Sequence, residues 1–226
     1  MHLLLLADGD APDRSVLDTV WPGWDDDVAR VIAADGGARH AAGLGRTIDH
    51  WVGDGDSLGP SGVAALQAEG VRVDLASTDK DASDTELALD AAIVAGATRI
   101  TVVGALGGQR LDHALANIGL LAIPDLAGRD VRLVATTARI RLVTAPDADG
   151  RPIAVELHGR TGDLVSLFPV DGDVEGITTR DLRYPLRAET LALGRARGLS
   201  NVRTSASAGV SVSRGRLLVV ETPATI

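Results

Sequence analysis

The sequence predicts an α/β domain with a mainly parallel, doubly wound sheet, followed by an all-β sandwich domain. In the first part of the chain, short β-type apolar segments alternate with helical patterns, as in a parallel sheet covered by helices on both faces. Later segments are short, alternate apolar with polar residues, and are separated by Gly, Pro, Asp and Asn. We place the first domain at residues 1–128 and the second at residues 129–226 of a 226-residue chain.

Strands and helices of the first domain are expected in alternation. Strands are predicted at 3–7, 29–33, 50–52, 71–75 and 99–104, and helices at 62–68, 85–95 and 111–123. In the second domain, strands are predicted at 131–135, 140–144, 153–157, 164–168, 209–213 and 217–221. A doubly wound sheet binds ligands at the carboxyl ends of its strands, so the loops that follow the first set of strands are where a site is expected.

The composition narrows the classes of function. A formal net charge of −9 disfavours a nucleic-acid partner, because phosphate backbones are bound by clustered Lys and Arg. There is no cysteine, which excludes disulfides, thiolate metal sites and cysteine nucleophiles. The apolar run at 3–6 is too short for a signal-peptide core, and we see no membrane-spanning segment. We therefore expect a cytoplasmic protein that is neither exported nor membrane-bound.

Four acidic clusters directly follow predicted strands. They lie at 34–37 (Ala-Asp-Gly-Gly), 53–57 (Gly-Asp-Gly-Asp-Ser), 78–84 (Thr-Asp-Lys-Asp-Ala-Ser-Asp) and 107–113 (Gly-Gly-Gln-Arg-Leu-Asp-His). All four should converge on one edge of the sheet. Carboxylates brought together repel one another unless their pKa values shift or they bind a metal, and Mg²⁺ prefers oxygen ligands and bridges to phosphates.

The cluster at 53–57 has two readings. A Gly-Asp-Gly-Asp segment is commonly a turn, because Gly supplies positive φ and Asp bonds its own backbone. Alternatively, in an extended segment Asp54 and Asp56 point to the same side, so both carboxylates could reach one Mg²⁺.

The other clusters also allow structural explanations. Ser83 and Glu86 fit a capping box, and Asp81 and Asp84 would favour the positive end of the helix that follows, although such a helix start also binds phosphate. Paired glycines, Gly36-Gly37 and Gly107-Gly108, would let a nucleotide approach the backbone. Arg110 and Lys80 could contact phosphate oxygens, or could simply be solvated surface charges.

Taken in order, the four clusters resemble the motif series of thiamine pyrophosphokinases. The similarity runs from about Val31 to Leu121 and continues weakly to the C-terminus. Each motif alone is unspecific, but four in this order and spacing are specific. The family has an α/β catalytic domain followed by a β-sandwich, which agrees with the layout predicted above.

The resemblance implies an enzyme that transfers a diphosphate group from Mg-ATP to the hydroxyl of thiamine, giving AMP. It implies Mg²⁺ and triphosphate ligands at Asp35, Asp54, Asp56 and Asp84, with Asp81 as a further candidate. It places the following residues around the ATP and the reacting groups: Gly36, Lys80, Ser83, Arg110 and Asp112. Ser200 and Asn201 resemble the segment beside the thiamine aminopyrimidine, and family members are typically homodimers.

In this mechanism Arg110 and Lys80 take up negative charge and Asp112 accepts the hydroxyl proton. Three alternatives share parts of the pattern. They are a diphosphokinase for another heteroaromatic alcohol such as a hydroxymethylpterin, a non-catalytic thiamine or nucleotide sensor, and a Mg-dependent phosphohydrolase. Intact aspartates in all four clusters disfavour the sensor, and product analysis separates the others.

Overall fold

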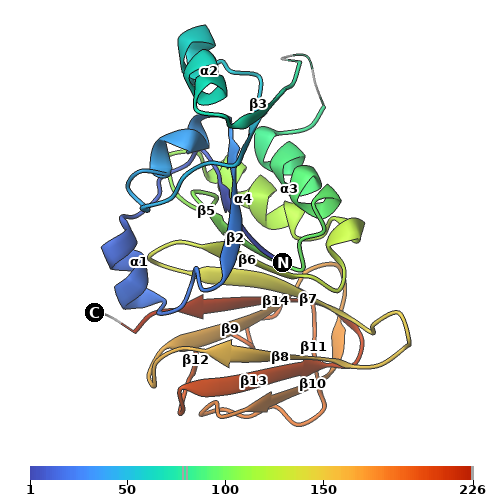
Figure 1. The fold of residues 1–226 in the computed structure, drawn as a ribbon. Helices are drawn as coiled ribbons and strands as arrows, with labels where there is room; N and C mark the ends of the chain where they lie inside the picture. Colours follow the sequence, from blue (N-terminus) through green and yellow to red (C-terminus); the bar gives the residue numbers. More distant parts are fainter. Residues whose placement is uncertain (78, 80, 225–226) are drawn as a thin grey trace. The chain divides into compact units, whose positions relative to one another are not determined.

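The computed structural model in Figure 1 describes residues 1–77, 79 and 81–224. Its contacts divide the chain into two compact units, Met1–Thr136 and Thr137–Ile226. Among the described residues, no helix is both long enough and apolar enough to cross a membrane.

The first unit is built on a parallel sheet with the strand order β6-β5-β1-β2-β3-β4. Its strands are β1 (His2–Leu6), β2 (Val28–Ala34), β3 (His50–Gly53), β4 (Arg72–Leu75), β5 (Arg99–Val103) and β6 (Asp130–Val134). Every residue of β1 is buried, as expected for a central strand covered on both faces. The chain proceeds from β1 outward through β2 to β4 and then returns to the other side of β1, so strand order reverses between β1 and β5.

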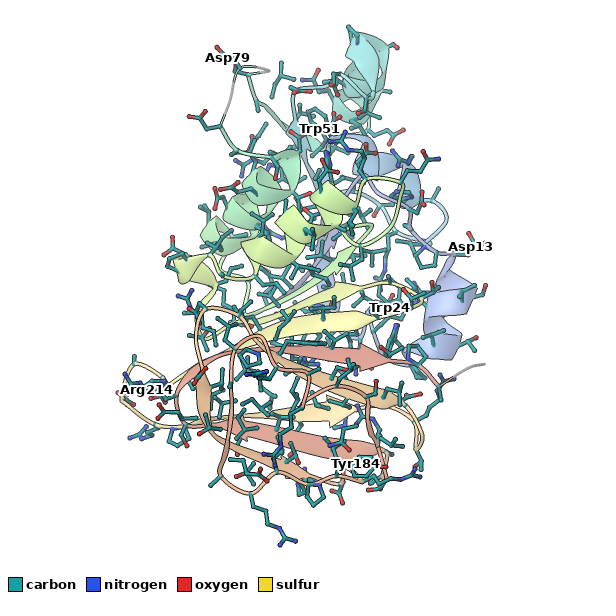
Figure 2. All side chains as sticks on the ribbon, turned by 180° about the vertical axis from the view of Figure 1, so that it is seen from behind. Asp13, Trp24, Trp51, Asp79, Tyr184 and Arg214 are labelled. Atoms are coloured by element: carbon teal, nitrogen blue, oxygen red, sulfur yellow. The ribbon has the colours of Figure 1, made fainter. Side chains whose placement is uncertain are left out.

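Helices cover both faces of this sheet, which confirms the doubly wound prediction (Figure 1). They are α1 (Arg14–Val20), α2 (Gly59–Ala68), α3 (Asp84–Val94) and α4 (Leu111–Leu120), with short 3₁₀ helices η1 (Asp35–His40) and η2 (Pro124–Leu126). Leu4 and Leu6 pack with Leu17 of α1 and with the buried tryptophans of this unit, of which Trp24 and Trp51 are labelled in Figure 2. On the other face, α3 contacts β1, β2 and β3.

Two features of this unit differ from the sequence-based expectation. The strand expected at 131–135 in the second domain is β6, which pairs in parallel with β5 after a crossover through α4. The two compact units accordingly divide after Thr136 rather than after residue 128. Helix α1 is not predicted at all, because only Leu17 and Val20 of its seven residues are buried and such a short helix carries little periodicity.

The second unit contains two antiparallel sheets, with the orders β12-β9-β14-β7 and β11-β10-β13-β8. Their strands are β7 (Arg139–Ala145), β8 (Ile153–His158), β9 (Leu164–Pro169), β10 (Val174–Arg180), β11 (Glu189–Leu191), β12 (Asn201–Val202), β13 (Ser207–Val212) and β14 (Gly215–Thr222). One hydrophobic core draws residues from both sheets, for example Val219 and Val210, so the predicted sandwich is confirmed. Strands β10, β11 and β12 are not predicted by the sequence; β10 contains a glycine with positive φ, and β11 and β12 are very short.

Candidate active site

Three of the predicted acidic residues meet at the carboxyl edge of the first unit's sheet. One ligand oxygen from each of Asp35, Asp54 and Asp56 lies within 4.8 Å of the others. Asp35 directly follows β2, and the other two follow β3, the neighbouring parallel strand. Because parallel strands end at the same edge, the loops after β2 and β3 bring these side chains together. We call Asp35, Asp54 and Asp56 the carboxylate group.

Asp35 is the buried member of this group, and its backbone is strained. It has φ of 39°, in the left-handed region that residues with a side chain rarely adopt. The indole Nε1 of Trp51 donates to its carbonyl oxygen at 2.9 Å. A Cβ on Gly53 would lie 2.8 Å from the Asp35 Cβ, so only glycine fits where β3 passes this residue. The surrounding structure therefore holds Asp35 in an unfavourable conformation, which is common at functional sites.

One carboxylate oxygen of Asp35 has no hydrogen-bond partner among the described residues. Oδ2 accepts a hydrogen bond from the Ser57 backbone at 3.3 Å, whereas Oδ1 is buried and accepts none from the part of the chain that the structure describes. A buried, unsatisfied carboxylate oxygen is costly in a folded protein. A hard divalent cation would satisfy this oxygen and offset the repulsion among the three carboxylates, so the residues present fit Mg²⁺.

Asp54 and Asp56 are joined by a turn, and not by the extended segment that the sequence analysis considered. Gly55 has φ of 78°, and Asp54 Oδ1 accepts a hydrogen bond from the Asp56 backbone at 3.1 Å. Asp56 Oδ1 in turn accepts from the Ser57 hydroxyl at 3.1 Å. The turn reading and the ligand reading are therefore compatible, because this turn brings both carboxylates into the group.

The third acidic cluster lies at the start of α3. Ser83 is the N-cap, and its hydroxyl accepts a hydrogen bond from the Glu86 backbone at 3.2 Å, as the capping-box pattern predicts. Asp84 occupies the first turn, is half-buried, and does not belong to the carboxylate group. Asp81 is exposed, and Lys80 lies outside the described residues.

Arg110 and Asp112, from the fourth cluster, form an exposed ion pair. Arg110 Nε donates to Asp112 Oδ1 at 2.9 Å, and Nη2 donates to Oδ2 at 2.5 Å. These hydrogen bonds from Arg110 hold the pKa of the Asp112 carboxyl well below its usual range. A carboxylate with a lowered pKa is a weaker base, so the pair is better arranged to present a guanidinium than to accept a proton.

A fifth loop, which the sequence analysis did not single out, lies where strand order reverses. Asp8, Gly9 and Asp10 follow β1, and a Cβ on Gly9 would lie 2.4 Å from the Gly104 carbonyl oxygen after β5. The Gly9 backbone donates to that oxygen at 2.9 Å. The sequence does contain a signal for this loop, because an Asp-Gly-Asp segment follows the first buried strand just as the other acidic clusters follow their strands. Applying the carboxyl-end rule to this strand as well would have found it.

In the second unit, the predicted pair Ser200 and Asn201 has two different environments. The Asn201 side chain is buried; its oxygen accepts from the Tyr184 backbone at 2.9 Å, and its nitrogen donates to the Tyr184 carbonyl at 2.6 Å. Its amide therefore fixes local backbone. Ser200 is exposed, has φ of 56°, and donates its backbone N–H to the Ser166 hydroxyl at 3.0 Å. Only Ser200 presents its side chain to solvent.

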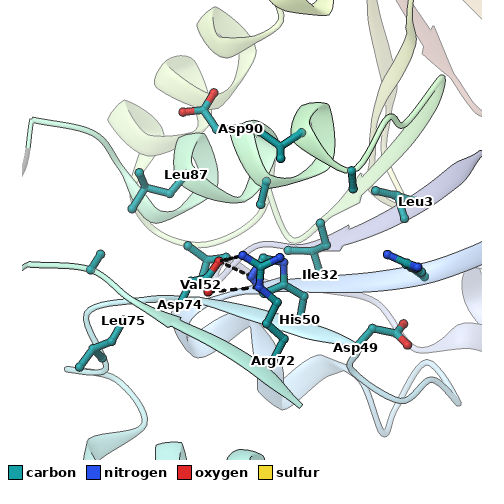
Figure 3. A pocket seen from close by; sticks show the side chains of 15 residues that line it. Leu3, Ile32, Asp49, His50, Val52, Arg72, Asp74, Leu75, Leu87 and Asp90 are labelled. Carbon is teal, nitrogen blue, oxygen red and sulfur yellow. Dashed lines mark hydrogen bonds and ion pairs between the residues drawn. The ribbon is translucent and has the colours of Figure 1, made fainter. Parts of the chain in front are cut away.

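A groove of about 760 Å³ lies beside α3 on the first unit's sheet (Figure 3). Its polar centre is Asp74, which accepts from Arg72 Nη2 at 2.7 Å and lies 2.8 Å from His50 Nε2. Burial alone would raise the pKa of Asp74, but these hydrogen bonds outweigh it and lower the pKa. The three groups satisfy one another, and none belongs to the carboxylate group.

Comparisons with known proteins agree with the two-part fold. A family profile described as thiamin pyrophosphokinase, catalytic domain, matches residues 24–133, and one described as thiamin pyrophosphokinase, vitamin B1 binding domain, matches residues 152–217. The thiamine pyrophosphokinase of Bacillus subtilis (strain 168) is 26% identical over 168 residues, which are 74% of this chain and 75% of that protein.

Solved structures are similar over the whole chain. The thiamin pyrophosphokinase of Geobacillus thermodenitrificans is 27% identical with a TM-score of 0.77, over 100% of this chain and 99% of that one. The Bacillus subtilis thiamine pyrophosphokinase has a TM-score of 0.80 at 23% identity, over 100% of both chains. Both profiles lie in order on one chain, so the protein is an ATP-dependent diphosphotransferase. The chain belongs to the thiamin pyrophosphokinase family.

Proposed function

We propose that the protein transfers the diphosphate group of ATP to the hydroxyl of thiamine and releases thiamine diphosphate and AMP. The observation that carries this proposal is the occurrence of both thiamin pyrophosphokinase domains, in order, on a chain whose catalytic unit assembles the carboxylate group. In the reaction, the thiamine hydroxyl oxygen forms a bond to the β-phosphorus of ATP, the bond from that phosphorus to the oxygen bridging to the α-phosphorus breaks, and the hydroxyl proton is released.

Asp35, Asp54 and Asp56 would hold Mg²⁺, with Asp84 at the start of α3 as a further candidate ligand. When bound, Mg²⁺ would neutralise phosphate charge and orient the triphosphate. The chain contributes a rigid arrangement: Trp51 anchors the Asp35 backbone, and the turn at Gly55 directs Asp54 and Asp56 to the same place. Such fixed positioning supplies most of what phosphoryl-type transfer requires from a protein.

Arg110 would bind the phosphates and stabilise the leaving AMP oxygen, with Lys80 as a second cation. One edge of the Arg110 fork, Nε and Nη2, contacts Asp112 on the exposed surface, and the other edge would face the phosphates. Gly36, Ser83 and Asp81 would lie around the nucleotide, with Gly36 allowing close backbone approach. Asp112 is a weaker candidate for proton acceptor than the sequence suggested, because of its lowered pKa.

We place the thiamine contact of the second unit at Ser200. Ser200→Ala should weaken thiamine binding by roughly 5- to 150-fold, because a buried aminopyrimidine nitrogen would lose its partner at a cost of ~1–3 kcal/mol. ATP binding should be unchanged. Calorimetric titration of both ligands measures the two effects. Ser213→Ala, at another exposed serine of this unit, is the control and should alter neither. Equal losses for both ligands, or no loss for thiamine, would contradict this placement.

Asn201 would act differently, by shaping the segment that carries Ser200. Its amide is engaged with the Tyr184 backbone on both its oxygen and its nitrogen.

We further propose, from the family resemblance, that the protein is a cytoplasmic homodimer.

The function is tested by the products formed from thiamine and Mg-ATP. Thiamine diphosphate and AMP are expected in equal amounts, and chromatography with phosphorus NMR would measure both. Turnover with a hydroxymethylpterin but not with thiamine would favour another heteroaromatic diphosphokinase. ADP or inorganic phosphate as the main product would indicate a hydrolase or a simple kinase, and binding of both ligands without turnover would indicate a sensor.

A further inference from the structure

Arg39 and His40 of η1 reach across to the loop after β1. Arg39 Nη1 pairs with Asp8 Oδ1, and its Nη2 donates to the Asp8 carbonyl oxygen. Nη1 also donates to the Gly36 carbonyl at 3.3 Å. The His40 Nε2 lies 2.8 Å from the Gly9 carbonyl oxygen. Since a carbonyl can only accept, Nε2 carries the proton in this contact. We call these contacts between η1 and the loop after β1 the η1 tie.

The loop after β1 is itself held against the loop after β5. Besides the bond from the Gly9 backbone to Gly104, a Cβ on Gly107 would lie 2.5 Å from the Asp10 carbonyl oxygen. The two loops therefore pack against each other with little space between their backbones. The η1 tie joins η1 to a loop that is itself bonded to the loop after β5.

The other end of η1 is Asp35, whose backbone is strained. A Cβ on Gly36 would lie 2.2 Å from Asp8 Oδ1, so the Asp8 carboxylate packs directly on the residue next to Asp35. A non-glycine residue stays in the left-handed region only when its surroundings hold it there. Arg39 Nη1 contacts the Gly36 carbonyl and the Asp8 carboxylate together, so it links the residue next to Asp35 to the loop after β1.

We propose that Arg39 is a positioning residue for the carboxylate group: by fastening η1 to Asp8, it keeps Asp35 where its carboxylate meets those of Asp54 and Asp56. This inference rests on the metal site proposed above. Arg39 and Asp8 have 51% and 47% of their side chains exposed, so the pair alone adds little to global stability. We expect the effect of the Arg39–Asp8 pair to be local and to appear in the affinity for the metal.

Simple electrostatics makes the opposite prediction. Arg39 is a cation near a site for a cation, so its removal should strengthen metal binding if charge alone matters. If Arg39 positions Asp35, removal should weaken binding. The sign of the change therefore separates the two explanations.

The experiment measures Mn²⁺ binding to the purified full chain without nucleotide, by electron paramagnetic resonance of the free ion. Arg39→Gln should weaken binding by about 3- to 10-fold, a size typical of removing one member of a contact network. Arg39→Lys keeps the charge but loses the planar fork, so weaker binding is expected here too. Arg180→Gln removes an arginine of similar exposure, 53%, from a surface pair in the second unit and should leave binding unchanged.

Circular dichroism melting without metal establishes that each variant is folded. Unchanged or tighter Mn²⁺ binding by folded Arg39→Gln would overturn the positioning role. If Arg39→Gln does not fold, Arg39→Lys is the deciding variant. Mn²⁺ binding by Arg39→Lys that equals wild-type binding would then overturn the proposal. Failure of the metal site itself looks different, because wild-type and Asp54→Asn proteins would then bind Mn²⁺ equally.

Discussion

Asp54→Asn and Asp56→Asn should each lower diphosphate transfer by at least about 100-fold while leaving the fold intact. Removal of a group that only supports a metal ligand typically costs about 10- to 100-fold, so loss of a direct ligand should cost at least as much. An asparagine oxygen at position 54 can still accept the hydrogen bond from the Asp56 backbone, which preserves the turn. The expected loss of turnover therefore measures the effect of removing the carboxylate charge and not a change in the turn. Steady-state kinetics across a Mg²⁺ series, with Mn²⁺ binding as a second readout, measures it.

Asp147→Asn is the matched control for this prediction. The Asp147 carboxylate also accepts backbone hydrogen bonds within a surface turn, from Asp149 at 2.9 Å and Arg151 at 2.8 Å, but it lies in the second unit, outside the carboxylate group. Its replacement should leave turnover and metal binding unchanged. Near-normal turnover of Asp54→Asn at low Mg²⁺ would mean that the cluster at 53–57 is only a turn.

The carboxylate group could be predicted from the sequence because it depends on a rule about strand ends. Asp35 follows β2, and Asp54 and Asp56 follow the neighbouring strand β3, so sheet topology brings them together whatever the loops do in detail. Asp84 is different. It occupies the first turn of α3 instead of the residues directly after a strand, and it lies outside the group. The orphaned oxygen of Asp35 and the η1 tie are visible only in three dimensions.

Parts of the fold escaped prediction for a related reason. The segment of β6, Asp-Val-Arg-Leu-Val, is short and alternates polar with apolar residues, a pattern that is typical of an antiparallel strand with one solvated face. Only its pairing with β5 assigns it to the first unit. In contrast, β1 and α3 were predicted to within a residue or two, because a fully buried strand and a capped helix each carry a strong local signal.

A buried ionic cluster in the second unit is the other feature on which a large effect is expected. Glu221 is fully buried and accepts from Arg139 Nε and Nη2, each at 2.8 Å, and from Arg203 Nη2 at 2.6 Å. Arg141 Nη2 lies 3.5 Å from Glu221 Oε1. Alternation along β14 places Glu221 on the face that carries Leu217 and Val219, so the cluster continues the sandwich core with charges.

This cluster has a defined dependence on pH. Burial alone would raise the pKa of Glu221, but the hydrogen bonds from Arg139 and the charges of Arg141 and Arg203 outweigh it and lower the pKa. A folded-state pKa below the unfolded-state value means that the ionised group stabilises the fold fully above the ordinary glutamate pKa. That contribution is lost as the pH falls through the folded-state value.

Glu221→Gln should therefore destabilise the second unit by about 3–5 kcal/mol at neutral pH, because it leaves three buried guanidinium groups without their shared anion. The difference from wild type should narrow in acid, where the wild-type carboxylate also loses its charge. Denaturant unfolding followed by circular dichroism measures this, while tryptophan fluorescence reports separately on the first unit, which contains all three tryptophans.

Glu156→Gln is the matched control, because Glu156 accepts from Arg180 at 2.6 and 2.7 Å but on an exposed surface, and little change is expected. A Glu221→Gln protein as stable as wild type at neutral pH would show that the arginines are adequately satisfied by backbone carbonyls such as those of Leu157 and His158.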